Sequence, residues 1–139
     1  MEKETKGNEI KKEYLKGYED AVRQMKRHEE RIHEIRQNRV SPTIILDGMP
    51  HAHGHNDLSS YAAILEEEER RYIKARYKRV MKCKEIMNKI ERLSNEDEKD
   101  VLMYRYIRLL KWEDICERMN LSWRRIHYIH NSALENFII

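Results

Sequence analysis

Apolar residues recur every three or four positions through the first part of the chain, and this spacing most constrains what it can fold into. Successive steps are 4, 3, 4, 3, 4 and 3 in a set of seven residues: Tyr14, Tyr18, Ala21, Met25, His28, Ile32 and Ile35. A heptad-like repeat of this kind predicts one face of a helix that packs against a second helix. We expect the helix from about Ile10 to Arg39, because Pro42 and the residue before it disfavour helical geometry. We interpret His28 as a packed polar residue of this seam.

A second amphipathic helix is predicted after a linker, 41–56, that contains both prolines of the chain. We expect this helix to begin near Asp57, with Asp57 or Ser59 as its cap, and to end at about Leu93. Its inward face is predicted to carry Leu65, Tyr72, Ile73, Val80, Cys83, Met87 and Ile90. The pair indicates an antiparallel, coiled-coil-like helical hairpin or half of a dimeric coiled coil, so residues 1–93 are interpreted as a helical hairpin and oligomerisation region. Charged residues make up 38% of the chain and glycine and proline are scarce, which favours an all-α fold.

Three of the seven histidines, His51, His53 and His55, lie in the predicted linker and raise the question of a metal site. Alternating histidines in a Gly/Pro loop lack the rigid i, i+4 spacing of a helical zinc pair, and no carboxylate base or nucleophile accompanies them. Cys83 and Cys116 are not spaced as a zinc pair either, and we interpret them as buried, reduced thiols. We therefore expect no metal, no cofactor and no catalytic residue, and a metal-dependent enzyme is the least favoured function class.

The charges are unevenly distributed, although the net charge is only +3. Residues 70–84 hold eight Lys or Arg and no acid, a pattern typical of a solvated helix face that also suits a phosphate backbone. Residues 118–134 hold three Arg, two His and again no acid. No stretch approaches the ~18 apolar residues of a membrane span, and the N-terminal segment lacks the apolar core of a signal peptide. We expect a cytoplasmic protein without a membrane partner.

The predicted helices become shorter after residue 93, so 94–139 is expected to form a separate small domain. Ser94 or Asn95 is the expected cap of its first helix. Two short helices are predicted from their apolar residues: Val101, Leu102, Tyr104, Ile107 and Leu109 in the first, and Trp112, Ile115, Cys116 and Met119 in the second. Asn120 suits a turn because it tolerates left-handed geometry, and Ser122 is expected to cap a third helix. The inward residues of that helix are Ile126, Ile129 and Ala133.

A short helix, a tight turn and a capped helix with a cationic outer face are the parts of a helix-turn-helix. The first turns of a recognition helix enter the major groove of DNA, where Arg pairs with guanine and Asn with adenine. The candidate DNA-binding residues are Ser122, Trp123, Arg124, Arg125, His127, Tyr128 and Asn131. A three-helix packing unit without any role in DNA binding is the alternative.

The stretch EDEKDVLMYRYIRLLKWEDICERMNLSWRRIHYIHNSALENF resembles the fourth conserved region of bacterial sigma factors, over about a third of the chain. The matching features are LMYRYI, the residues 112–115, the turn residues 119–122 and the pair Ala133-Leu134. Carried over by position, the base-reading residues fall on Trp123, Arg124, His127 and Tyr128, with Ser122 and Arg125 nearer to phosphate. Trp123 and Cys116 depart from the family pattern, which has a small or charged residue and a Gly or Ala there.

The layout of the whole chain resembles small phage-encoded transcriptional regulators of the RinA/ArpU type. This resemblance implies a non-enzymatic, sequence-specific regulator of late phage genes, which binds double-stranded DNA in the cytoplasm of a bacterial host. The hairpin is expected to form a homodimer or to contact host RNA polymerase, and no small-molecule substrate is expected. No region resembles a promoter-melting sigma domain. The alternative is a DNA-packaging protein of the small terminase kind, which a ring of more than four chains would favour.

Overall fold

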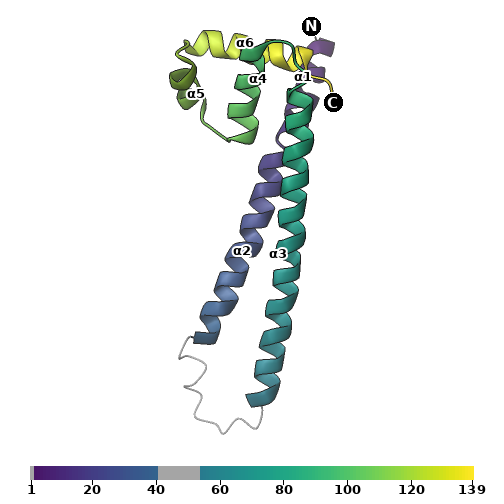
Figure 1. Cartoon of the computed structure of the whole chain (residues 1–139), viewed down its shortest axis with the longest axis vertical. Coiled ribbons are helices and arrows are strands. Elements are labelled where there is room, and N and C mark those ends of the chain that lie inside the picture. Colours follow the sequence, from purple (N-terminus) through teal and green to yellow (C-terminus); the bar gives the residue numbers. More distant parts are fainter. Residues whose placement is uncertain (1, 41–53) are drawn as a thin grey trace. The chain divides into compact units, whose positions relative to one another are not determined.

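A computed structural model of the chain describes residues 2–40 and 54–139, and every regular element in these ranges is helical (Figure 1). The elements are α1 (Glu2–Leu15), α2 (Gly17–Val40), α3 (Gly54–Ile90), α4 (Glu96–Leu102), the π-helical η2 (Met103–Ile107), α5 (Trp112–Met119) and α6 (Trp123–Asn136). The predicted all-α fold is confirmed. The helices group into two compact units: the first joins the residues up to Ala21 with Arg79–Ile139, and the second is Val22–Lys78.

The N-terminal helical region starts earlier than predicted and is divided at Lys16. It begins at Glu2 and not near Ile10, because the prediction followed apolar spacing and the first turns are polar. Gly17 opens α2 at a crowded position, where an added Cβ would come within 2.7 Å of Cε of Lys82. The backbone N–H of Lys16 still donates to Lys12 O at 2.9 Å, so the chain stays helical through the division.

The predicted bounds of the second long helix were wrong at both ends. Since α3 begins at Gly54, Asp57 and Ser59 lie inside the helix and neither is its cap. The helix ends at Ile90 and not at about Leu93. The predicted linker therefore loses 54–56, and the rest of it, with His51 and His53, lies outside the described residues.

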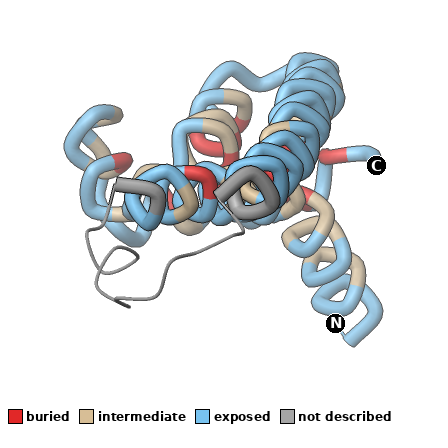
Figure 2. Tube along the Cα trace, turned by 90° about the horizontal axis from the view of Figure 1, so that it is seen from below, coloured by how far each residue is buried: buried red, intermediate tan, exposed pale blue. Residues whose placement is uncertain are grey.

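The buried face of α3 also differs from the prediction, and much of the helix surface is exposed (Figure 2). In the second unit Glu68 and Ala75 are buried, whereas Ile73 is 66% exposed. In the first unit the predicted Ile90 is buried, and so is Ile86, which was not predicted, whereas Val80 is 52% exposed and Met87 is exposed as well. The inward positions include the polar Glu68, which a prediction based on apolar residues omits. The predicted buried face of α3 was therefore rotated about the helix axis, toward Ile73.

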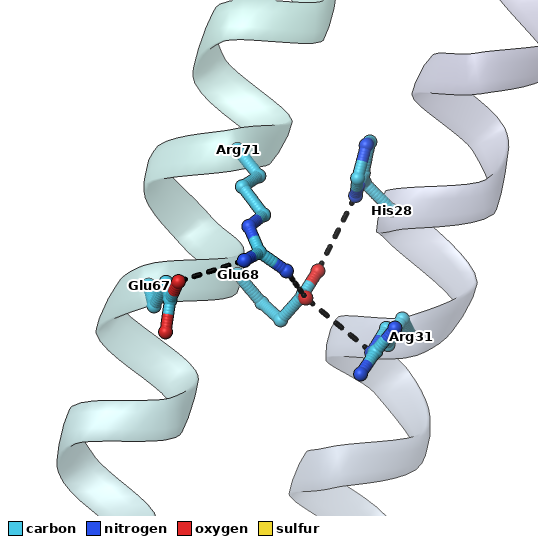
Figure 3. A network of polar contacts seen from close by, with 5 residues as sticks. All are labelled: His28, Arg31, Glu67, Glu68 and Arg71. Carbon is cyan, nitrogen blue, oxygen red and sulfur yellow. Dashed lines mark hydrogen bonds and ion pairs between the residues drawn. The ribbon is translucent and has the colours of Figure 1, made fainter.

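Glu68 joins α2 to α3 in the second unit through a network of polar contacts (Figure 3). Its carboxylate lies 3.3 Å from Nδ1 of His28, 3.3 Å from Nε of Arg31 and 3.0 Å from Nη1 of Arg71. Burial of the carboxylate acts to raise the pKa of Glu68, but the hydrogen bond from His28 and the two guanidinium groups outweigh it and hold that pKa below its usual value. The predicted packed role of His28 agrees with this position in the seam.

We expect Glu68→Gln to lower the free energy of unfolding by about 1–2 kcal/mol at neutral pH, because hydrogen bonds to a charged acceptor are lost. The contribution of Glu68 should be full above its unfolded pKa and disappear as the pH falls through its lower folded pKa. Glu66→Gln is the matched control, because Glu66 is exposed and pairs with the exposed Arg70 at 3.5 Å, so this variant should change stability by less than about 0.5 kcal/mol. Urea denaturation followed by circular dichroism measures both, and equal effects would contradict the role of Glu68.

The first unit joins α1 to the C-terminal helices, so it does not follow the predicted division of the chain into 1–93 and 94–139. Nζ of Lys11 on α1 donates to the carbonyl oxygens of Leu134 and Glu135, at 2.7 and 3.1 Å, at the end of α6. The rings of Tyr14 and Phe137 lie 6.1 Å apart, and Phe137 is fully buried. Periodicity within a segment carries no information about this pairing, since the partners are more than 100 residues apart.

Candidate nucleic-acid interface

The turn between α5 and α6 has the local geometry that the sequence predicts. Asn120 ends α5 with φ 53° and ψ 45°, which is the left-handed region that asparagine tolerates. Ser122 caps α6, and its Oγ accepts a hydrogen bond from the backbone N–H of Arg125 at 3.2 Å. The cap of α4 is Asn95, whose side chain accepts from the N–H of Glu98 at 3.1 Å.

One side of α6 is anchored in a small apolar core. Ile126 and Ile129 pack with Val101 of α4 and Ile115 of α5, and further apolar residues cover this cluster: Tyr104, Leu110, Trp112, Cys116, Met119 and Leu121. Ala133 and Leu134 are also fully buried. The predicted inward face is confirmed, and it fixes which residues of α6 point outward.

Three of the candidate residues, Arg124, Tyr128 and Asn131, form an exposed line along α6. Their spacing of four and three residues places them on the side opposite the core. Arg125 is exposed on the neighbouring flank, with its guanidinium 5.3 Å from the centre of the Tyr128 ring. These three residues, the exposed row of α6, therefore offer one cation, one phenol and one amide on successive turns of the helix.

His127 is placed differently from the other candidates. Its ring lies between the rings of Trp112 and Trp123, at centroid distances of 4.7 and 4.6 Å. Its Nε2 is buried and has no hydrogen-bond partner among the described residues. In this arrangement His127 supports Trp123, whose side chain is 51% exposed, and Nε2 does not face outward.

The aromatic stack continues into the domain through residues that the sequence analysis did not assign to the site. The guanidinium of Arg105 lies 4.7 Å from the Trp112 ring and donates to the Leu110 carbonyl at 3.0 Å. The edge of Trp112 also meets His130, at 4.8 Å between ring centres. The spacing of 123, 127 and 130 along one flank of α6 is the signal that identifies this stack in the sequence.

A buried polar pair lies beneath the stack. Nε2 of His130 is 2.8 Å from the hydroxyl of Tyr106, and both side chains are almost fully buried. Burial, with smaller effects from Lys12, His127 and Arg105, lowers the pKa of His130 to about 4. Burial also raises the pKa of Tyr106 to about 12, so both groups are neutral at neutral pH.

The outer face of α6 carries positive charge up to Leu134. The nearest acid of α4 turns inward, because Glu98 is buried and accepts hydrogen bonds from Ser132 at 2.7 Å and from Asn136 at 3.2 Å. Arg118, Arg124 and Arg125 are exposed. The start of the exposed row therefore carries positive charge, which suits a phosphate backbone, whereas the exposed Glu135 follows Asn131 at its far end.

The described residues offer neither a metal site nor a membrane-spanning helix. No group of three or more His, Cys, Asp or Glu in 2–40 and 54–139 is arranged to hold a metal ion. The cysteines are free, and both Cys83 and Cys116 are half-buried and not fully buried as expected. None of the described helices has the length and apolar character needed to cross a membrane.

Comparison with known proteins assigns the chain to a family. The chain matches the model of a family described as a protein of unknown function (DUF1492) over residues 56–137, which span most of α3 and all of α4, η2, α5 and α6. No curated protein and no solved structure matches the chain. Because the matched residues make up more than half of the sequence, the chain belongs to the DUF1492 family.

Proposed function

We propose that this protein is a sequence-specific DNA-binding transcriptional regulator without enzymatic activity, and that α6 is its recognition helix. The observation that carries the proposal is the exposed row Arg124, Tyr128 and Asn131, held outward by the buried face of α6. A helix of this kind fits the major groove, where arginine bonds to guanine and asparagine to adenine.

The start of α6 suits the DNA backbone. The backbone N–H groups of the first turn and the positive end of the helix dipole favour a phosphate. Arg125 lies in this first turn, and the Ser122 hydroxyl can still donate a hydrogen bond while its oxygen caps the helix. We therefore propose that Arg124 contacts a base edge and that Arg125 contacts a phosphate group of the DNA backbone.

The resemblance to the RinA/ArpU type extends the proposal to late genes of a phage in the cytoplasm of a bacterial host. In the second unit, α2 and α3 lie side by side with opposite directions (Figure 1). We assign this hairpin to self-association as a homodimer or to contact with host RNA polymerase. A dimer would present two recognition helices to half-sites about 34 Å apart or multiples of that distance.

In-vitro selection of bound DNA tests the proposal, and a set of arginine variants tests the helix. Arg124→Ala should lower affinity for the selected site by about 5- to 100-fold and relax the preference at one base pair. Arg125→Ala should weaken binding to all sequences and reduce the salt slope by about 1. Arg92→Ala, at an exposed arginine of the first unit outside the row, is the matched control and should leave affinity unchanged.

If selection enriches no sequence, the proposal of a sequence-specific regulator is overturned. If both α6 variants bind with undiminished affinity, the assignment of α6 as the recognition helix is overturned. Mass photometry of the complex separates the two DNA-binding functions. A monomer or dimer supports the regulator, whereas a ring of more than four chains supports a DNA-packaging protein of the small terminase kind.

A further inference from the structure

Trp123 is a large apolar side chain at the position of α6 where the proposed function places base contacts. It is the first residue of the helix, directly after the Ser122 cap, and it is 51% exposed. Arg124 and Arg125 follow it and are exposed as well. An indole ring left half in solvent between a cap and two cations has no role in the core cluster of this unit.

The ring of Trp123 is held from behind and is not a freely rotating side chain. His127 lies 4.6 Å from it and is backed by Trp112 at 4.7 Å, which in turn carries the guanidinium of Arg105 at 4.7 Å. Nε2 of His127 is buried without a hydrogen-bond partner among the described residues, so its position in the stack satisfies packing and not hydrogen bonding. A fixed ring loses little conformational entropy when it binds.

The chemistry of the major groove indicates what such a surface recognises. Base edges there display hydrogen-bond donors and acceptors, and the C5-methyl group of thymine is the apolar group among them. We propose that Trp123 reads the C5-methyl group of a thymine in the bound DNA, with His127 as the residue that positions its ring. This inference rests on the proposed function and adds the base that the start of α6 selects.

The methyl group can be removed from the DNA without any other change. Each thymine of the selected site is replaced in turn by deoxyuridine, and affinity is measured by fluorescence anisotropy. Wild-type protein should lose about fourfold in affinity at one thymine, the effect of a single buried methyl group. At the same position, 5-methylcytosine should bind about fourfold more tightly than cytosine.

Variants of the stack assign the effect to Trp123 and His127. Trp123→Ala should bind thymine and deoxyuridine sites equally, whereas Trp123→Phe keeps an apolar ring without the N–H and should retain discrimination. His127→Ala should reduce discrimination while leaving the salt slope unchanged, and His127→Phe should restore it by replacing the stacked ring. A residue needed only for folding would not change the ratio of the affinities for the thymine site and the deoxyuridine site. Thermal unfolding of each variant is measured alongside to detect a loss of folding.

Each alternative outcome contradicts a separate statement. Sequence-specific binding that is indifferent to every thymine methyl, or a selected site without thymine, overturns this inference and leaves the proposed function standing. A methyl effect that persists in Trp123→Ala shows that another residue reads the methyl group and also overturns it. Failure of selection to enrich any sequence removes the proposed function and this inference together.

Discussion

We expect the first unit to lose about 2 kcal/mol of stability between pH 7 and pH 5, and about 3 kcal/mol by pH 4, through His130 alone. The pKa of His130 is about 4 in the folded protein, below its ordinary value of 6.5, chiefly because the ring is buried. Between these two values the unfolded chain binds a proton that the folded chain does not, so acid favours unfolding. The stability contribution is full above pH 6.5 and is lost as the pH falls toward 4.

The surroundings of His130 explain why protonation is costly. The charged groups that act on it, Lys12 of α1 and Arg105 of η2, are both positive, and His127 adds to their effect. Its hydrogen-bond partner, the Tyr106 hydroxyl at 2.8 Å, carries no charge at neutral pH because the pKa of Tyr106 is raised to about 12. None of the described residues that act on His130 therefore supplies a counterion to its imidazolium form.

Urea denaturation followed by tryptophan fluorescence measures this effect, since both tryptophans of the chain lie in the first unit. His130→Gln is the comparison variant, because glutamine keeps a polar group and does not titrate. We expect its stability to be lower at pH 7 but to change less between pH 7 and pH 5 than that of the wild type. Equal pH dependence in the two proteins would show that His130 is not the titrating group.

Ile126→Ala should lower the stability of the first unit by about 3 kcal/mol, within the usual 2–5 kcal/mol for a large-to-small change in a core. Ile126 is fully buried and packs in the cluster with Val101, Ile115 and Ile129. The lost packing also loosens the side of α6 opposite the exposed row. Under the proposed function, we therefore expect weaker DNA binding although no outward residue is changed.

Ile138→Ala is the matched control for this prediction. The same side-chain atoms are removed in the same unit, but Ile138 is 74% exposed, so the expected change is within about 0.5 kcal/mol. Fluorescence-detected urea denaturation compares both variants with the wild type. A cost below about 1 kcal/mol for Ile126→Ala would contradict the packing of α6 described above.

Local features of the candidate site follow from the sequence because they depend on backbone geometry and on side chains within a few residues. Asn120 adopts the left-handed conformation that its side chain tolerates, and Ser122 and Asn95 cap the helices that follow them. The inward residues of α6 follow from a period of 3.6 residues in the same way. Three of the outward residues, Arg124, Tyr128 and Asn131, follow from the same period because they lie on the side of α6 opposite the buried residues.

Two buried positions that the sequence did not predict are occupied by acidic residues, Glu68 and Glu98. Glu68 occupies the seam of α3 because His28, Arg31 and Arg71 surround its carboxylate, and this displaced the predicted apolar face toward Ile73. Glu98 lies in the first turn of α4, where acids usually face solvent, yet it turns inward to Ser132. Such burial depends on partner residues from other helices, and the spacing of apolar residues within one helix carries no information about those partners.

The sequence by itself determined that the chain is all helical, where α5 turns into α6, and which face of α6 is apolar, because each of these is a short-range property of the backbone. Only the tertiary structure decided that α1 packs on the end of α6, that His127 is held between Trp112 and Trp123, and that His130 is buried beside Tyr106. Apart from the Trp123–His127 contact, which lies within α6, these contacts join residues from different helices. Burial and aromatic packing are set by what lies opposite a side chain, and that is known only once the helices have assembled.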